Sequence, residues 1–590
     1  MDRKDLEKES APELAKKSAE APTSCDASSA SDDDEPEYAP IRNPPASAGA
    51  PRPPSSKEGG GGDLNRPLTA ASSASRRTVS RVRSNNGYGC DDGDDDGDGN
   101  RGADGNAAGP DHPPERDPFE VCFEKGDRDP LCPRSMGIAR KWMIVLITSC
   151  GALCVTCASS IYTSSYGPMT AEFGCSNLVA TIGLSTFVLG IAMGPAWSPL
   201  SEFYGRRPVY LASFLLFAVW IVPSAVAHNI ETMIVARFFQ GFTGSAFLSV
   251  SGGTVSDLFS KQDMSLPMAV FTLAPFIGPC IGPLMGGFIN TYVDWRWTHW
   301  VLVAWSLVLL AAVALLVPET YHPVLLRDRA RALRAETGDG RWVAPMERRR
   351  AGQSSSVAGS VARSLLRPFQ MLASEPICVA LDLYSAILLG ILYLFFGAFP
   401  LVFSRNHGFA LWQTGMTFLG LLVGMVAGVF TDPYWQRARA RLVAALERET
   451  GVEGASEPEF HLPCVMAGGV LTPVGLFMFG WTTFPWVHWI VPLIGSAVFG
   501  IGYMLAFKGI FTYLVDAYPT YSASAIAANV FVRCALAAAF PLFGVQMYNA
   551  LGYQWATSVL AFLTVAMMPF PFIFFYYGKK IRARSRYAAQ

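Results

Sequence analysis

The chain of 590 residues has little charge: Asp, Glu, Lys and Arg make up 16% of it, whereas 50% of its residues are hydrophobic. A typical soluble domain carries about 25% charged residues. The composition therefore argues against a cytosolic enzyme. Residues 1–138 hold 18 basic and 28 acidic residues, a net charge of −10, and the remainder holds 29 and 20, a net charge of +9. An acidic N-terminal part thus precedes a basic, very apolar body.

Sequence patterns that would indicate catalysis or ATP use are also missing. No G-x-x-x-x-G-K-[ST] pattern occurs, which argues against an ATP-driven pump. The seven histidines fall in the N-terminal part, in loops or at the ends of apolar runs, and no nucleophile–base pair stands out. The cysteines form no cluster with histidines, so we predict no metal site and no cofactor. A membrane-embedded enzyme is a poor fit to this sequence.

The N-terminal part has too few apolar residues to form a core. It contains four glycines at 59–62, an acidic run at 91–98 and many Ser, Pro and Ala residues. Such a segment cannot offset chain entropy by burial, so we predict that residues 1–138 are a disordered cytoplasmic tail. The basic run at 76–83 would be a solvated patch or a phosphorylation or anionic-lipid site. We expect no cleavable signal peptide, because no apolar run follows the first residue.

From residue 142 onward, apolar stretches recur that are long enough to cross a bilayer, for which a helix needs about 20 residues. Several contain Gly and Pro, which transmembrane helices tolerate when neighbouring helices cover the backbone. We place twelve spans at residues 142–162, 178–200, 208–228, 232–256, 266–290, 298–317, 376–403, 411–430, 462–481, 488–514, 523–547 and 554–577. The sequence therefore predicts an all-α integral membrane protein with twelve transmembrane helices.

The loops between these spans differ strongly in basic charge. With both termini in the cytoplasm, the inner loops hold 25 Lys and Arg residues, and the outer loops hold only Arg296 and Arg405. This bias supports cytoplasmic termini and an even number of spans. Residues 319–375 form a polar central loop, so the body divides into two six-helix halves, 139–318 and 376–577. A basic cytoplasmic tail follows at 578–590.

A weak repeat indicates that the two halves are related. After span two, Glu202 is followed five residues later by Arg207, and after span eight Asp432 is followed five residues later by Arg437. The acids that end spans four and ten are Asp257 and Asp516. Two related halves around a midplane site are typical of a transporter.

The most specific motif is the run GPCIGPLMGG in span five. Gly278, Gly282 and Gly286 recur every four residues and leave one smooth helix face, which lets another helix approach closely. Pro283 removes a backbone hydrogen bond and bends the helix. Together with Gly287, the run resembles the antiporter motif G-x-x-x-G-P-x-x-G-G of the major facilitator superfamily, with every defined position filled. The resemblance implies a secondary transporter.

Span four carries a charge within an apolar run. Arg237, Gln240, Gly241 and Gly244 share one helix face, and such an Arg should face a cavity or a partner. The pattern resembles the superfamily's R-x-x-x-G motif, whose Arg is thought to take part in proton transfer. Because Arg does not release its proton at ordinary pH, its role would be to bias a nearby carboxylate or bind an anionic group. Alternatively, it extends to the outer surface.

A short charged loop follows span two. The run EFYGRRP, with Glu202, Gly205, Arg206 and Arg207, resembles the cytoplasmic gate motif of the superfamily in its fungal drug-transporter form. Glu202 would pair with the Arg residues and with the positive N-terminus of a facing helix, which closes the inner gate in one state. Alternatively, these charges only set the topology. The corresponding gate residues of the second half are Asp432, Arg437 and Asp516.

Three further charges lie within predicted spans. Asp382 and Lys508 lie near the cytoplasmic third and would either titrate or anchor the interface. Arg533 lies near mid-membrane and favours a cavity. No span has an acid at its very centre, so the sequence does not identify the proton carrier. The predicted transport and coupling set is Arg237, Gln240, Gly241, Asp257, Asp382, Lys508 and Arg533. Four aromatic residues of span seven, at 393, 395, 396 and 399, would line a cavity or face lipid.

Residues 117–586 as a whole resemble the fungal twelve-span drug:proton antiporter family. The resemblance implies a proton-coupled exporter of hydrophobic or amphipathic small molecules that works by alternating access. The cargo would be drugs or a self-made secondary metabolite, such as a glycolipid or an organic acid. A polyamine exporter and a transporter-like membrane sensor are the alternatives. The basic residues in the spans favour neutral, amphipathic or anionic cargo, so Arg533→Ala should impair an anionic substrate more than a neutral one.

The expected partners are the small-molecule substrate, protons and the lipid bilayer, with no nucleic acid, and we expect a monomer. The family expectation for the location is the plasma membrane, and the vacuole or another internal membrane is the alternative. No N-x-[ST] sequon occurs, so glycosylation does not indicate the compartment.

Overall fold

The computed structural model describes residues 119–260, 263–351, 357–452, 455–519, 521–585 and 587–588. These residues belong to one compact unit, Arg83–Gln590. Most of the predicted tail, with its glycine, basic and acidic runs, lies outside the described residues.

Twelve helical spans in this part of the chain are long and apolar enough to cross a membrane. They are Ile138–Phe173, Asn177–Tyr204, Arg206–Ala225, Ile230–Leu258, Ser265–Tyr292, Trp297–Leu316, Pro376–His407, Leu411–Thr450, Pro458–Trp481, Ile490–Ala517, Ser522–Leu551 and Tyr553–Arg582. Each corresponds to one predicted span, and the predicted all-α membrane fold is confirmed. The eighth span is much longer than the predicted 411–430, because a polar helix continues it beyond Asp432.

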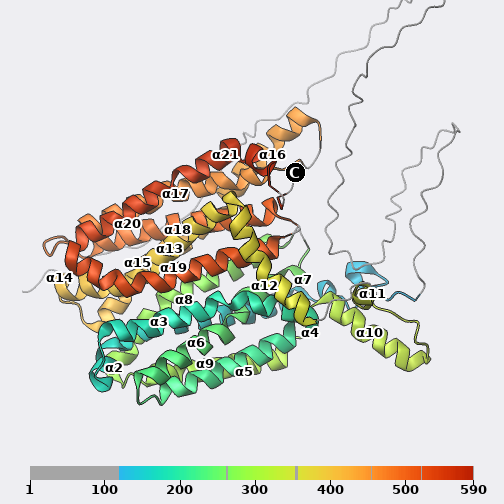
Figure 1. Cartoon of the computed structure of the whole chain (residues 1–590), viewed down its shortest axis with the longest axis horizontal. Coiled ribbons are helices and arrows are strands. Elements are labelled where there is room, and N and C mark those ends of the chain that lie inside the picture. Colours follow the sequence, from blue (N-terminus) through green and yellow to red (C-terminus); the bar gives the residue numbers. More distant parts are fainter. Residues whose placement is uncertain are drawn as a thin grey trace, which may run out of the picture. The chain divides into compact units, whose positions relative to one another are not determined.

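The N-terminal half contains six spans, several of them in consecutive helical segments (Figure 1). Its α-helices are α1 (Ile138–Ile161), α2 (Tyr166–Phe173), α3 (Asn177–Ala192), α4 (Trp197–Tyr204), α5 (Arg206–Ala225), α6 (Ile230–Gly244), α7 (Ala246–Leu258), α8 (Ser265–Tyr292) and α9 (Trp297–Leu316). Gly174 ends α2 in a left-handed conformation, and Gly205, with φ of 106°, separates α4 from α5.

The predicted central loop is largely helical. It contains α10 (His322–Thr337), α11 (Pro345–Ala351) and α12 (Val357–Ser374), and α12 contacts both α4 and α19. The C-terminal half follows with α13 (Pro376–Phe399), α14 (Arg405–His407), α15 (Leu411–Phe430), α16 (Asp432–Thr450), α17 (Leu462–Trp481), α18 (Ile490–Ala517), α19 (Ser522–Leu551), α20 (Tyr553–Met567) and α21 (Pro569–Arg582).

The two halves meet along two helix pairs, α8 with α15 and α3 with α19. Hydrogen bonds also join them, and one of these runs from the Cys280 thiol of α8 to the Met425 sulfur of α15 at 3.9 Å. The hydroxyls of Ser159 and Tyr393 lie 3.0 Å apart, and the Ser185 hydroxyl donates to the Ala538 carbonyl at 2.6 Å. Ser159 lies near the C-terminal end of α1, and Ser185 lies in the N-terminal part of the second span. Both bonds lie toward the ends of these spans that are remote from the turn between α4 and α5.

A small module, residues 119–135 with α10 and residues 338–347, packs outside the spans (Figure 1). Val121 and Phe123 are buried against Leu326 and Ala330 of α10, and the backbone of residue 121 bonds to Val343. Burial lowers the pKa of His322 in this module to about 4, so its ring is uncharged at neutral pH. Folded structure therefore begins before the predicted tail boundary at 138, because these few apolar side chains find partners in the central loop.

The cysteines of the described part are mostly buried free thiols, as expected for small hydrophobic side chains. Cys154 and Cys157, three residues apart in α1, are both free. Cys122 is the exception, because it is disulfide-bonded.

Candidate transport and gating site

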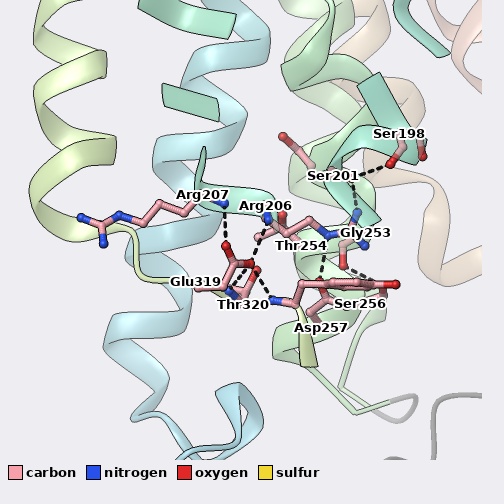
Figure 2. A network of polar contacts seen from close by, with 12 residues as sticks. Ser198, Ser201, Arg206, Arg207, Gly253, Thr254, Ser256, Asp257, Glu319 and Thr320 are labelled. Carbon is pink, nitrogen blue, oxygen red and sulfur yellow. Dashed lines mark hydrogen bonds and ion pairs between the residues drawn. The ribbon is translucent and has the colours of Figure 1, made fainter. Parts of the chain in front are cut away.

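A buried network centred on Arg206, the first residue of α5, lies at the end of the N-terminal half where α4 meets α5. Its Nε donates to Asp257 Oδ2 at 3.1 Å, and its Nη1 donates to the Ser201 hydroxyl at 2.6 Å. Figure 2 shows the guanidinium pointing toward Ser201 and Asp257. A Cβ at Gly253 would collide with this guanidinium, so glycine leaves the space that Arg206 occupies. Asp257, predicted for the coupling set, thus lies in the gate.

The N-terminus of α5 is capped by Glu319, an acid from the segment after span six. Its two carboxylate oxygens accept from the backbone N–H groups of Arg206 at 2.8 Å and Arg207 at 3.1 Å (Figure 2). A negative charge at this position is favourable, because the helix N-terminus carries partial positive charge. A Cβ at Gly205 would meet the same carboxylate, and the positive φ of Gly205 also disfavours other residues.

The predicted pairing of Glu202 with the neighbouring Arg residues is absent among the described contacts. Glu202 is exposed, and Asp257 and Glu319 contact Arg206 instead. The Arg207 side chain donates to the Ala314 carbonyl of α9 at 2.7 Å. The local spacing suggested Glu202, the acid nearest to Arg206 in the sequence. The fold instead brings two acids that are distant in the sequence into contact with Arg206.

The C-terminal half has its own network of charged groups. Asp432, the first residue of α16, forms an ion pair with Lys508 of α18. Asp516 near the end of α18 lies 2.9 Å from Nε2 of His461 and 3.7 Å from Nη2 of Arg439. Asp432, Lys508, His461 and Arg439 line a small pocket. Lys508, predicted for coupling or anchoring, is thus a partner of the gate acid Asp432.

Arg437, which the repeat places as a partner of Asp432, is exposed and forms none of the described ion pairs. Asp432 instead finds its cation 76 residues away along the chain, on α18. The repeat located the acid but not its partner.

Arg237 is fully buried inside the N-terminal half, which excludes the alternative that it reaches the outer surface. Its guanidinium donates to the carbonyls of Ala158 at 2.7 Å and Ser159 at 2.9 Å. The rings of Tyr162 and Phe187 lie 4.5 and 4.3 Å from it. The described contacts of Arg237 include no carboxylate. It therefore joins span four to span one, close to the Ser159–Tyr393 bond between the halves.

Gln240 and Gly241, which follow Arg237 in the motif, join α6 to neighbouring helices in different ways. Gln240 donates to the Trp220 carbonyl at 2.9 Å and the Ser224 hydroxyl at 2.6 Å, and its oxygen lies 3.4 Å from Arg237 Nη1. A Cβ at Gly241 would overlap the Phe187 backbone, so glycine allows α6 and α3 to pack closely.

The glycine face of α8 packs against α1, as the close-approach argument requires. A Cβ at Gly278, Gly282 or Gly286 would overlap atoms of α1 or of the turn that follows it. Gly287 instead faces α15 of the other half, and a Cβ at Gly415 of α15 would meet the Pro283 carbonyl. The motif helix thus contacts both halves at once.

Asp382 is fully buried in α13 and is held by neutral groups. The Asn529 amide of α19 donates to its Oδ1 at 3.0 Å, and the Cys378 thiol lies 3.3 Å from its Oδ2. Asn529 also donates to the Ser385 hydroxyl at 2.6 Å. Among the described residues, no basic group lies within ion-pair distance of Asp382.

Arg533 lies one helical turn after Asn529 on α19, and its Cζ is 4.8 Å from the Phe507 ring centre. It is half-buried.

The aromatic residues of span seven are buried, at 0 to 4% exposure, so the lipid-facing alternative is wrong for them. Phe395 and Phe399 pack on Phe479 within the C-terminal half.

Sequence reasoning assigned no role to several residues of this site: Glu319, Gly253, His461 and Asn529. The available signals were weak. Glu319 directly follows span six, and His461 directly precedes span nine, where a charged partner for a loop acid would be expected.

A comparison with known families gives the identity of this arrangement: the profile of the Major Facilitator Superfamily matches residues 148–541. The chain belongs to this superfamily. It is a multi-pass membrane transporter and not an enzyme.

Similar superfamily members come from fungi. The chain is 51% identical to the efflux pump atB of Aspergillus terreus, over 80% of this chain and 90% of that protein. It is 39% identical to the probable drug/proton antiporter YHK8 of Saccharomyces cerevisiae, again over 80% and 90%. It is 38% identical to the citrinin biosynthesis cluster MFS transporter mrr1 of Monascus ruber, over 78% and 91%.

Among solved structures, the xylose transporter XylE of E. coli has the same fold. The bromo-deoxyglucose complex of XylE matches with a TM-score of 0.51 at 15% identity, over 74% of this chain and 96% of that one. At this identity the match describes the superfamily fold alone.

Proposed function

We propose that this transporter is a proton-coupled exporter of hydrophobic or amphipathic small molecules. The relatives named as efflux pumps support export, and the relative named as a probable drug/proton antiporter supports proton exchange. The relative named for a citrinin biosynthesis cluster supports a self-made metabolite as one class of cargo.

The observation that carries alternating access is the unequal contact between the halves. The Ser159–Tyr393 and Ser185–Ala538 hydrogen bonds between the halves lie on the outer side. A weaker thiol contact, Cys280–Met425 at 3.9 Å, lies midway along α8. The networks of Arg206 and of Asp516 at the cytoplasmic end each stay within one half. These contacts support a state in which the halves are closed on the outside. Glu202, exposed here, is available to dock on the facing half when the inner side closes.

Proton coupling needs a carboxylate that takes up and releases a proton within the membrane, and Asp382 supports this role. It is buried and accepts hydrogen bonds only from neutral groups, so gain of a proton breaks no ion pair. Arg533 lies one turn beyond Asn529. Its positive charge stabilises the charged form of Asp382 without forming an ion pair with it. Arg237, whose described partners are carbonyls, would then act as a packing residue.

The basic inner loops support cytoplasmic termini, and the plasma membrane is the proposed location. The small-molecule cargo and protons are the proposed partners of a monomer.

The test is the accumulation of a labelled azole in cells that overexpress the protein. Accumulation should fall on overexpression, and a protonophore should erase this difference. Asp382→Asn keeps the shape of the side chain and should reduce export by about tenfold or more. Asp263→Asn, a change of an exposed loop acid, is the matched control. Export that persists with the protonophore, or full activity of Asp382→Asn at equal surface expression, would contradict the proposal.

A further inference from the structure

Two polar groups near the meeting of the halves have no hydrogen-bond partner. They are Nε of Arg533 on α19 and the hydroxyl of Tyr503 on α18, and both atoms are buried. Tyr503 is fully buried as a residue, and Arg533 belongs to none of the described ion pairs. Buried donors of this kind cost stability unless another group satisfies them. Their presence therefore points to a missing acceptor.

The two donors lie in one aromatic cluster. The Arg533 guanidinium lies over the Phe507 ring. Tyr503 lies one turn before Phe507 on α18, and their stacked rings have centroids 6.4 Å apart. Phe276 of α8 contacts both rings, with centroid distances of 4.4 Å to Phe507 and 5.5 Å to Tyr503. Because α8 belongs to the N-terminal half, the cluster contains side chains from both halves.

The depth of Arg533 in the membrane makes an anionic partner valuable. It lies 11 residues into α19, roughly 16 Å along the helix, near the middle of a bilayer. A charge at this depth is costly unless it is paired. The nearest acid on this face, Asp382, is already held by Asn529 and Cys378 and lies beyond ion-pair distance.

We propose that Arg533 and Tyr503 bind the carboxylate of a small aromatic acid whose ring packs against Phe276 and Phe507. A carboxylate offers several acceptor sites, and its hydrogen bonds to a guanidinium are strong because both groups are charged. Offset or edge-on packing of a flat ring suits the neighbouring aromatic side chains. This inference rests on the proposed export function and names one cargo class for it. Separation of the halves would remove Phe276 from the ligand and so favour release.

The experiment uses the full chain in nanodiscs and two probes that differ only in charge and in one functional group, 2-naphthoate and 2-naphthamide. Equilibrium binding should favour naphthoate by about tenfold in the unaltered protein. Arg533→Gln should abolish this preference while naphthamide binding stays within about twofold, and Arg533→Lys should keep part of the preference. Tyr503→Phe should weaken naphthoate binding by a few-fold, roughly the effect of one hydrogen bond. Arg405→Gln, at an exposed outer position, should change neither probe.

Equal binding of both probes by the unaltered protein would overturn the proposal, and so would an equal loss of both in Arg533→Gln. Retained naphthamide binding shows that a variant is folded. Binding is measured without a proton gradient, so its failure leaves protonophore-sensitive azole export standing. Failure of that export would leave the naphthoate preference standing.

Discussion

Arg206 pairs with Asp257 in the N-terminal half, and His461 pairs with Asp516 at the matching place in the C-terminal half. In each half a basic residue at the start of one span contacts an acid at the end of the next. The side chains of the first pair are 9 and 12% exposed, and those of the second are 16 and 41% exposed. The same position thus holds a buried pair in one half and a more exposed pair in the other.

The neighbouring groups of the two pairs also differ. Glu319, from the segment after span six, caps α5 through the backbone of its first two residues. In the C-terminal half the acid and the base exchange places. Glu459 lies beside the start of α17, and Nε of Arg582, at the end of α21, lies 2.7 Å from Oε1 of Glu459. We infer that the N-terminal network fixes one rigid unit, whereas the exposed His461–Asp516 pair can rearrange as the gate moves.

The largest expected effect follows from breaking the buried pair. Asp257→Asn leaves Arg206 buried without its counter-charge, and such a change costs about 3–5 kcal/mol. Asp516→Asn, the matched change in the other half, should cost only about 0–1 kcal/mol because its surroundings are wet. Thermal unfolding in detergent measures both. Equal losses of unfolding free energy in the two variants would show that the two pairs contribute equally to stability.

An intermediate effect is expected from the helix cap. Glu319→Gln keeps an acceptor but removes the charge at the N-terminus of α5, which should lower the free energy of unfolding by about 1 kcal/mol. Glu202→Gln, four residues before Arg206 but exposed and outside the described hydrogen bonds, should leave that free energy within about 0.5 kcal/mol. A larger destabilisation by Glu202→Gln than by Glu319→Gln would mean that Glu202, as the sequence suggested, is the acid that holds the loop.

The smallest effect on stability is expected from His461→Arg, which makes the C-terminal pair resemble the N-terminal one. The free energy of unfolding should change by less than about 1 kcal/mol, because the pair is partly exposed. His461→Gln separates loss of charge from loss of the hydrogen bond. A change in His461→Arg as large as that in Asp257→Asn would show that the C-terminal pair is held as tightly as the N-terminal one.

The spans could be predicted from the sequence because membrane crossing is set by the local length of an apolar run. The same holds for the glycine face of α8, where Gly278, Gly282 and Gly286 signalled close packing in advance. The sequence did not name the partner helix, α1, because contact between helices depends on the whole fold.

The pairs of the gate could not be predicted, because their members lie far apart along the chain. Glu319 lies 113 residues from Arg206, and the Asp432–Lys508 pair spans 76 residues. Local spacing therefore suggested Glu202 and Arg437, which are exposed. The module at residues 119–135 was missed for a related reason: Val121 and Phe123 are too few to indicate a core until α10 supplies the other side.

The most direct test of alternating access measures two distances in the same protein. Spin labels at exposed positions 204 and 434 would report the cytoplasmic ends of the two halves, and labels at exposed positions 178 and 551 would report their outer ends. When cargo and a proton gradient are supplied to the full chain in liposomes, the inner distance should shorten while the outer one lengthens. Inner and outer distances that change in the same direction, or that do not change at all, would contradict the account.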